Sequence, residues 1–419
     1  MALAVQHDLD IEQLDAVTAF LQGKLKDEEI YMEQPEGYVV DPTKVCKLQK
    51  ALYGLKQSSR VWNTQLDEAL KAFGLIRSNL DPCLYFILKE DGKMLFVTIY
   101  VDDFLVFTND EELKKKLKCY LNSRFKMKNI GEAKFCLGLQ ITRDRTNGKL
   151  FLDQQAYIKD VLKRFNMENS KPVATPMDSN VKLDKSRGPK TPEEMAEMKN
   201  VPFKEAVGSL LYAAQATRPD IAFAVNLVSQ FSINPGRQHW EAVKRIMRYL
   251  RGTLDAKLMY TRGGDSQLTG YTDADWGGDP DTRKSTTGYV FRKMGGAVSW
   301  SVKRQPSVAL SSCEAEFIAL SRTTQEALWW QQLIEQIDGK QAIPIFCDNQ
   351  SAICMTRNDG CNPRTKHVSI RYQFVKDVVE KGDIKLHYIP TDEHPADGFT
   401  KALARQKHSQ FMKLTGIVG

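Results

Sequence analysis

Cysteine and long apolar runs are both scarce in this chain of 419 residues. Its eight cysteines include no pair at the CxxC spacing typical of zinc and redox sites, so we expect buried thiols, including those that recur at 347, 354 and 361. No apolar run approaches the roughly 18 residues that a membrane-spanning helix needs. The start, MALAVQHDLDIEQLD, lacks the basic region and apolar core of a secretory signal. We therefore expect a water-soluble protein that resides inside the cell.

The composition is that of a globular protein with several cores. Hydrophobic residues make up 42% and charged residues 26% of a chain that is long enough for two or three domains. The net charge of +7 suits a polyanionic partner but does not require one.

Local patterns divide the chain into three parts. Residues 96–108, FVTIYVDDFLVFT, predict a hairpin with acids at its tip, and EELKKKLKCYLNSRF predicts a helix after it. Residues 171–202 are polar and rich in proline, which is typical of a linker. Helical patterns then run from 203 to 251 and stop at Gly252, and a strand-rich segment follows 261–267. The predicted division is 1–170, 171–262 and 263–419.

Three aspartates in the first part carry the chemistry. Asp15 lies in QLDAVTAFLQG, and Asp102 and Asp103 lie in YVDD. A polymerase palm needs carboxylates on adjacent strands that hold two Mg²⁺ ions about 3.5–4 Å apart. Taken alone, YVDD is also compatible with a plain polar hairpin tip.

Four motifs in this order resemble the reverse-transcriptase palm of copia-type long-terminal-repeat retrotransposons. They are DLDIEQLDAVTAFLQGKLKDEEIYMEQPEGY, KLQKALYGLKQSSRVWN, YVDD and FKMKNIGEAKFCLGLQI. The resemblance implies that Asp15 and Asp102 bind the metals, with Asp103 and the Ala16 carbonyl beside them. It also implies that the segment 135–138 holds the primer end. The substrate contacts that it implies are Phe20, Tyr53, Gly54, Lys56 and Tyr100.

Phe20 has two possible roles. The chain also differs from the usual family sequence at two points. Phe20 would exclude a 2′-hydroxyl and so favour dNTPs, but it could equally pack in the core. Ser59 stands where the family usually has proline. The chain also begins about fourteen residues before Asp15, so we expect the basic fingers of the family to be missing from it. Without those cations we expect polymerisation to be impaired.

The last part resembles an RNase H domain of the same family. Its acids lie in LTGYTDADWGGD, SSCEAEFIALSRTTQEALWW, IPIFCDNQSAI and HPADGFTKAL, and KHVSIRYQF at 366–374 also fits. The expected order is strand, hairpins, long helix, strand and terminal helix. The resemblance implies that four carboxylates converge on two Mg²⁺ ions, namely those of Asp273, Glu316, Asp348 and Asp397.

Some neighbouring residues compete for these roles. Glu314 and Glu316 point about 200° apart on a helix, and we favour Glu316 because it matches the family's ligand position. Asp275 shares a strand face with Asp273 and could be an acceptor behind it. His394 could shuttle a proton, or it could be an ordinary surface histidine.

The middle segment carries a basic stripe. Lys244, Arg248 and Arg251 fall on one face of its last predicted helix, with Arg245 next to them. The stripe could follow the phosphates of a hybrid, or it could be a solvated face.

The expected fold class is α/β (α+β): a palm with a ferredoxin-like sheet, a helical thumb or connection region, and an RNase H-like mixed sheet with flanking helices. The expected activities are RNA-directed DNA synthesis and hydrolysis of RNA in RNA–DNA hybrids. Two Mg²⁺ ions, or Mn²⁺, would serve each site, and the partners would be hybrid, RNA template, DNA primer and dNTPs, with no membrane. The family also implies cytoplasmic virus-like particles and nuclear entry. The alternative is an inactive or co-opted fragment that binds nucleic acid or protein, since no integrase or protease motif is present.

Overall fold

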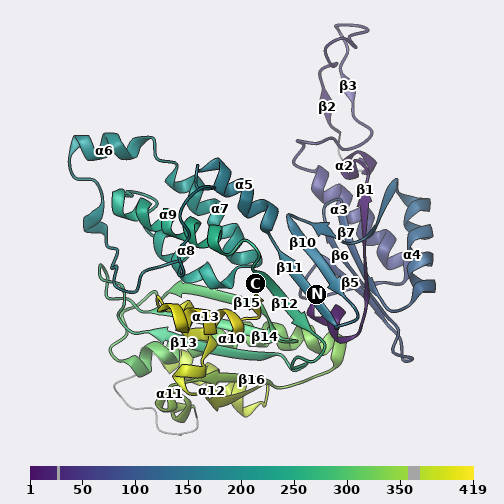
Figure 1. Cartoon of the computed structure of the whole chain (residues 1–419). Helices are drawn as coiled ribbons and strands as arrows, with labels where there is room; N and C mark the ends of the chain where they lie inside the picture. The colour runs from purple at the N-terminus through teal and green to yellow at the C-terminus, as the bar shows by residue number, and fades with distance from the viewer. Residues whose placement is uncertain (26–28, 357–368) are drawn as a thin grey trace. The chain divides into compact units, whose positions relative to one another are not determined.

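The chain folds into two compact units, which are described separately. The computed structural model describes residues 1–25, 29–356 and 369–419 (Figure 1). One unit comprises His7–Cys136, and the other comprises Met1–Gln6 together with Leu137–Gly419. The expected residues Cys361 and 366–368 lie outside the described part.

An antiparallel sheet of six strands forms the first unit. Its order is β4-β5-β6-β7-β1-β8. The strands are β1 (Asp10–Ala16), β4 (Ile76–Arg77), β5 (Leu84–Leu88), β6 (Met94–Tyr100), β7 (Asp103–Thr108) and β8 (Met127–Glu132). Strands β6 and β7 pair antiparallel, which confirms the hairpin predicted for 96–108. The short strands β2 (Tyr31–Met32) and β3 (Cys46–Lys47) pair apart from this sheet, and β9 (Phe135–Cys136) ends the unit.

Two long helices, α3 (Ser58–Phe73) and α4 (Glu111–Arg124), share one core with the sheet. The predicted helix α4 begins where the Asp110 side chain accepts a hydrogen bond from the Leu113 amide, and Leu117 and Leu121 are fully buried. The short helix α2 (Ala19–Gln22) follows β1. The core thus fixes the strand ends that carry the predicted acids.

In the second unit, a sheet joins segments distant in sequence. Its strands are β10 (Leu139–Asp144), β11 (Lys149–Asp153), β12 (Lys257–Thr261) and β18 (Ile417–Val418), and the helix α1 (Ala2–Gln6) lies against β12. Leu150 pairs with Tyr260 across β11 and β12. This pairing crosses the predicted boundary at 170, and the pairing of β12 with β18 crosses the one at 262. The three functional domains stay a prediction.

The helical part has its own core. It contains α5 (Gln155–Arg164), η1 (Lys185–Arg187), α6 (Pro192–Lys199), α7 (Phe203–Ala216), η2 (Pro219–Ile221), α8 (Ala222–Ser229) and α9 (Arg237–Gly252). The helices predicted for 203–251 are confirmed, with Gly252 as the last residue of α9. Within the segment expected to be a linker, α6 begins with a capping box between Thr191 and Glu194 and buries no residue.

The last sheet is mixed, as predicted. Its order is β15-β14-β13-β16-β17, with β13, β16 and β17 parallel. The strands are β13 (Thr269–Asp275), β14 (Thr286–Lys293), β15 (Gly296–Arg304), β16 (Ile343–Cys347) and β17 (Ile384–Tyr388). The remaining helices are α10 (Ser312–Asp338), α11 (Gln350–Met355), α12 (Ser369–Glu380), η4 (Thr391–Glu393), η5 (Pro395–Phe399) and α13 (Arg405–Leu414).

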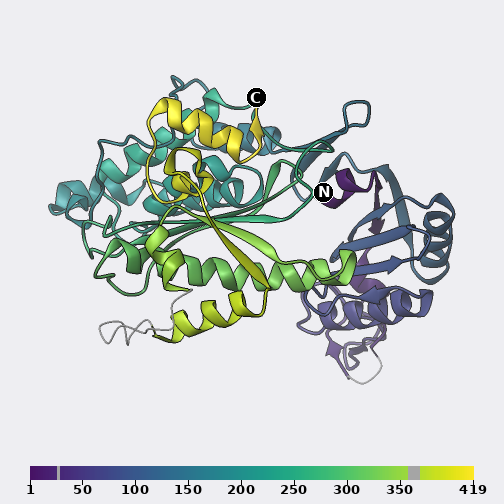
Figure 2. The same cartoon turned by 90° about the horizontal axis from the view of Figure 1, so that it is seen from below.

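The long helix α10 covers one face of this sheet, and η5 and α13 lie on the other (Figure 2). Phe317 and Leu320 of α10 are fully buried against Phe291 and Ile345 of the sheet. The expected order of elements and the mixed α/β fold class are therefore confirmed. Among the described helices, none combines the length and apolarity that crossing a bilayer requires.

Candidate active sites

The first acidic cluster lies at one end of the sheet in the unit His7–Cys136. Asp15 at the end of β1 is directly opposite Asp103, the first residue of β7. Asp102 lies in the turn before β7, and its carbonyl oxygen accepts a hydrogen bond of 2.8 Å from the Ala16 amide. The register of β1 and β7 therefore brings Asp15 close to the adjacent pair Asp102 and Asp103, which lie far from it in sequence.

The turn that carries Asp102 has an unusual backbone. Val101 has a φ of 58°, a conformation that costs free energy for a β-branched residue. Its carbonyl oxygen accepts a 2.7 Å hydrogen bond from the indole nitrogen of Trp62, a core residue of α3. The core thus holds the turn in the position that presents the acids.

The three carboxylates crowd one another. Burial raises the pKa of Asp15, and repulsion from Asp102 and Asp103 raises it further, while Lys128 on β8 opposes the shift. The Gln13 side chain donates a 3.0 Å hydrogen bond to Asp103. Carboxylates are the ligands that Mg²⁺ prefers, and a divalent cation would relieve their repulsion, so this donor set fits the expected metal.

The predicted substrate residues lie in the same unit. The Phe20 ring packs partly on the core, and its centroid lies 4.9 Å from the centroid of the Tyr53 ring. Tyr53 and Tyr100 are 55% and 62% exposed, which leaves their rings free to meet a ligand. Gly54 and Lys56 are exposed in the turn before α3.

The departure at Ser59 has a simple structural account. Ser59 is the second residue of α3. Proline is tolerated in the first turn of a helix, where an amide has no partner within the helix. Serine can therefore replace the family's proline there without a change of fold.

The segment 135–138, which is predicted to hold the primer end, crosses the boundary between the two units.

The second acidic cluster lies wholly in the larger unit, where four elements each supply one acid. Asp273 comes from β13 and Glu316 from α10, while Asp348 follows β16 and Asp397 lies in η5. Neighbouring groups hold three of these side chains. Thr400 donates a hydrogen bond to Asp273, the Ala274 amide donates one of 3.3 Å to Glu316, and Thr391 donates one of 2.8 Å to Asp348.

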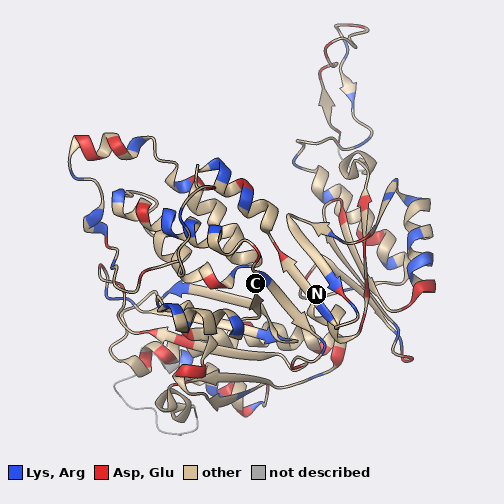
Figure 3. Ribbon diagram, in the orientation of Figure 1, with Lys and Arg blue, Asp and Glu red and all other residues tan. Residues whose placement is uncertain are grey.

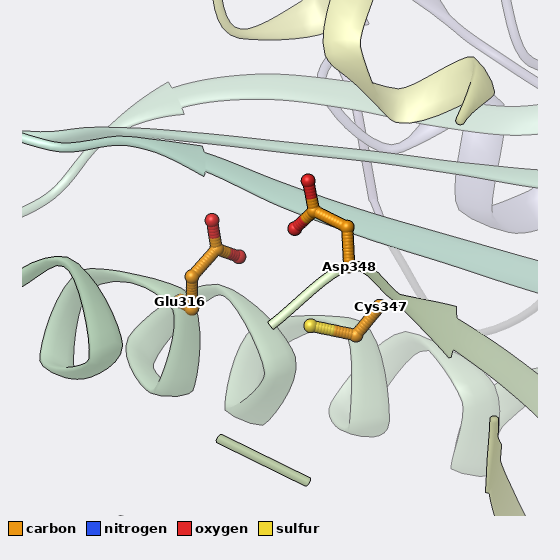
Figure 4. A group of neighbouring side chains, drawn as sticks. All are labelled: Glu316, Cys347 and Asp348. Atoms are coloured by element: carbon orange, nitrogen blue, oxygen red, sulfur yellow. The ribbon is translucent and has the colours of Figure 1, made fainter. Parts of the chain in front are cut away.

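The two candidate glutamates have different surroundings. Glu314 is at the start of α10, and its carboxylate accepts a 2.8 Å hydrogen bond from the Leu310 amide. Glu316 is 6% exposed and lies close to Asp348 (Figure 4). The geometry thus agrees with the choice of Glu316, whose role as a metal ligand stays a prediction.

Burial and mutual repulsion disfavour the charged forms of these acids. Burial, with Asp273 and Asp348 nearby, raises the pKa of Glu316 to about 10. Burial and the charge of Asp397 raise the pKa of Asp273 to about 7. Burial also raises the pKa of Asp275. Bound cations would stabilise the ionised carboxylates, so this donor set also fits the expected Mg²⁺.

Comparison with known proteins places the chain in a family. Residues 1–179 match the family model described as reverse transcriptase (RNA-dependent DNA polymerase). The whole chain is 47% identical to the retrovirus-related Pol polyprotein from transposon TNT 1-94 of Nicotiana tabacum, and covers 32% of it. It is 35% identical over 317 residues to the putative transposon Ty5-1 protein of Saccharomyces cerevisiae, which it covers completely. The chain belongs to the Pol family of copia-type retrotransposons.

This Pol chain spans about a third of the length of the Nicotiana polyprotein. Among solved structures, a foamy viral protease-reverse transcriptase in complex with dsDNA has a TM-score of 0.51 and 13% identity. The match covers 93% of this chain and 59% of that one, and it supports the fold alone.

Two residues of this Pol chain near the second cluster escaped the sequence analysis. The Lys401 ammonium lies 2.5 Å from Asp397, and Thr400 holds Asp273. The sequence offered one indication of Lys401, namely its position four residues after Asp397 and so about one helical turn away.

The interpretation of His394 as a surface residue is wrong, since its side chain is only 3% exposed. Its Nδ1 accepts a 3.1 Å hydrogen bond from the Ala396 amide and so caps the helix that carries Asp397.

Figure 3 marks the basic residues along α9 in blue. Three of them contact the chain's own preceding segment. Arg248 and Arg251 donate hydrogen bonds of 2.7 and 2.6 Å to the carbonyl oxygens of Lys171 and Glu168. Arg245 donates one of 3.1 Å to the Thr175 hydroxyl. These arginines therefore fasten the segment 168–175 to the helix, a role that neither earlier interpretation included.

Proposed function

We propose that this Pol chain hydrolyses the RNA strand of RNA–DNA hybrids, using Asp273, Glu316, Asp348 and Asp397 as ligands of two divalent cations. The observation that carries the proposal is the convergence of these acids from four separate elements. When bound, two Mg²⁺ ions activate the attacking water and stabilise the leaving oxygen. Mn²⁺ would be an alternative.

The chain's own groups would keep the carboxylates in place for this reaction. Thr400, the Ala274 amide and Thr391 each hold one acid by a hydrogen bond. Ligands held in position need less reorganisation when the cation and the hybrid bind. The capped helix η5 would do the same for Asp397.

The cluster Asp15, Asp102 and Asp103 would serve RNA-directed DNA synthesis. Its partners would be an RNA template, a DNA primer and dNTPs, with Phe20, Tyr53, Gly54, Lys56 and Tyr100 near the incoming nucleotide. The family membership and the shared end of β1 and β7 support this role. The parts 1–170, 171–262 and 263–419 would act as palm, connection and RNase H, in cytoplasmic virus-like particles with access to the nucleus.

A matched pair of variants tests the nuclease. Glu316→Gln and Glu314→Gln remove the same charge two residues apart on α10. With a labelled RNA–DNA hybrid and Mg²⁺, we expect Glu316→Gln to lose at least about 100-fold in rate, and Glu314→Gln to stay within a few-fold of the parent. Equal rates in both variants, or hybrid binding without cleavage by the parent chain, would favour the co-opted binding fragment.

A further inference from the structure

A thiol lies beside two of the acids in the second cluster. Cys347 is the last residue of β16, directly before Asp348. Its sulfur, a carboxylate oxygen of Glu316 and one of Asp348 all lie within 4.8 Å of one another. Figure 4 shows the three side chains extending toward a common space from α10 and the end of β16.

The buried carboxylate of Glu316 points into this group. Glu316 is 6% exposed, and its Oε1 accepts the hydrogen bond from the Ala274 amide. Its Oε2 is buried and has no hydrogen-bond partner among the residues that the structure describes. A buried acceptor without a partner costs free energy, and a cation at this point would satisfy it.

The mixture of donors selects a particular class of cation. Mg²⁺ prefers oxygen ligands, whereas Zn²⁺ and Cd²⁺ accept sulfur together with oxygen. In a tetrahedral zinc site, bonds of about 2.3 Å to sulfur and 2.0–2.2 Å to oxygen place these donors roughly 3.5 Å apart. Small rotations of the three side chains would therefore close the group around one ion.

We propose that Glu316, Cys347 and Asp348 form a mixed sulfur–oxygen site for a thiophilic divalent cation, which competes with Mg²⁺ for the two carboxylates. The cation replaces the thiol proton, which passes to the solvent, and nothing is oxidised or reduced. Inhibition of hybrid hydrolysis by this cation rests on the proposed nuclease function. Binding of the cation to the three side chains does not.

Binding is tested by titrating the metal-free full chain with Cd²⁺ and recording the sulfur-to-cadmium charge-transfer absorption. The chain has eight cysteines, so the result is the difference between variants. We expect Cys347→Ser to lose the tightest-binding component of the signal. The exposed Cys354→Ser serves as the matched control and should retain it.

Glu316→Gln keeps the thiol and provides a second test. For a mixed site, it should weaken the Cd²⁺ signal at least about 10-fold in affinity, because one of the three ligands is lost. Circular dichroism establishes that each variant is folded, and Cys347→Ala replaces Cys347→Ser if the serine variant is not. A tight component that is unchanged in both the Cys347 and the Glu316 variants would overturn the proposal.

Inhibition is measured separately, relative to each variant's own uninhibited rate of hybrid hydrolysis in Mg²⁺. The Cd²⁺ or Zn²⁺ concentration for half inhibition should rise at least about 10-fold in Cys347→Ser and stay unchanged in Cys354→Ser. Equal inhibition of the parent and Cys347→Ser would contradict the proposal that a cation bound by Cys347 competes with Mg²⁺. If the spectral difference is present but no variant hydrolyses hybrid, the cation site stands and the nuclease proposal fails.

Discussion

The indole nitrogen of Trp62 donates a 2.7 Å hydrogen bond to the carbonyl oxygen of Val101, in the turn that presents Asp102 and Asp103. The bond ties a helix of the core to a backbone segment with a positive φ. Trp62 also packs edge-on against Phe125, with 5.1 Å between ring centroids. The turn that carries these aspartates therefore depends on a core residue of α3.

Trp62→Phe should keep the aromatic packing and lose this hydrogen bond. Val101 is exposed, so water can replace the lost donor, and we expect the free energy of unfolding to fall by about 0.5–1.5 kcal/mol, the net contribution of one hydrogen bond. Denaturant titration measures it. The rate of primer extension by Trp62→Phe, relative to the parent, should fall by more than the loss of stability explains. An unchanged rate would show that the turn keeps its position without Trp62.

The raised pKa values in the second cluster predict a pH-dependent stability of the metal-free protein. The ordinary values are 4.5 for Glu316 and 3.8 for Asp273, and the folded values are about 10 and about 7. Between these limits the folded chain binds more protons than the unfolded chain. The contribution of these groups is therefore full below the ordinary values and is lost as the pH rises through about 7 and then about 10.

Denaturant titrations at several pH values measure this loss. The parent and Glu314→Gln should become less stable between about pH 6 and pH 9, whereas Glu316→Gln should show a flatter profile. A parent profile that rises over this range would contradict the assignment of the shifts to repulsion and burial.

Divalent cations should restore the stability that is lost through repulsion among the acids of the second cluster. A ligand at about 100 times its Kd stabilises a folded protein by about 2.7 kcal/mol. We expect Mg²⁺ to raise the unfolding free energy by about that amount at alkaline pH, and Asp348→Asn to lose much of the gain. Asp392→Asn changes an exposed acid of η4 and is the control. If Mg²⁺ raised the unfolding free energy of Asp348→Asn as much as that of Asp392→Asn, the stabilising Mg²⁺ site would lie outside the second cluster.

Lys401 offers a test of the electrostatic balance at the same site. Its ammonium lies 2.5 Å from Asp397 and partly neutralises the acids, although the side chain is 47% exposed. After screening by solvent, removal of the charge in Lys401→Met should tighten Mg²⁺ binding by about 1 kcal/mol, or roughly five-fold. Calorimetric titration measures the affinity. Lys407→Met removes an exposed partner of Asp392 and should change it little.

Local patterns were sufficient for the hairpin at 96–108 and for helix α4, because both have a strong period and a clear start or turn signal. The opposition of Asp15 and Asp103 depends on a register between strands far apart in sequence, and only the family resemblance pointed to it. The burial of His394 could not be predicted from the sequence, because the segment around it has no periodic pattern of apolar residues. The packing of β11 on β12 joins residues about a hundred positions apart, which no local signal encodes.

The arginines of α9 predict how the segment 168–175 is held. Loss of Arg248 or Arg251 removes a hydrogen bond to a backbone carbonyl oxygen in this segment, so the segment should detach more often from the helix. In Arg248→Ala we therefore expect limited proteolysis by a glutamate-specific protease after Glu168, an exposed residue of this segment, to become several-fold faster. Lys244→Ala is the matched control, because Lys244 pairs with Glu241 of its own helix. A stripe that serves mainly to bind hybrid phosphates would give the reverse pattern: both variants would weaken hybrid binding by similar factors, and neither would change the cleavage after Glu168.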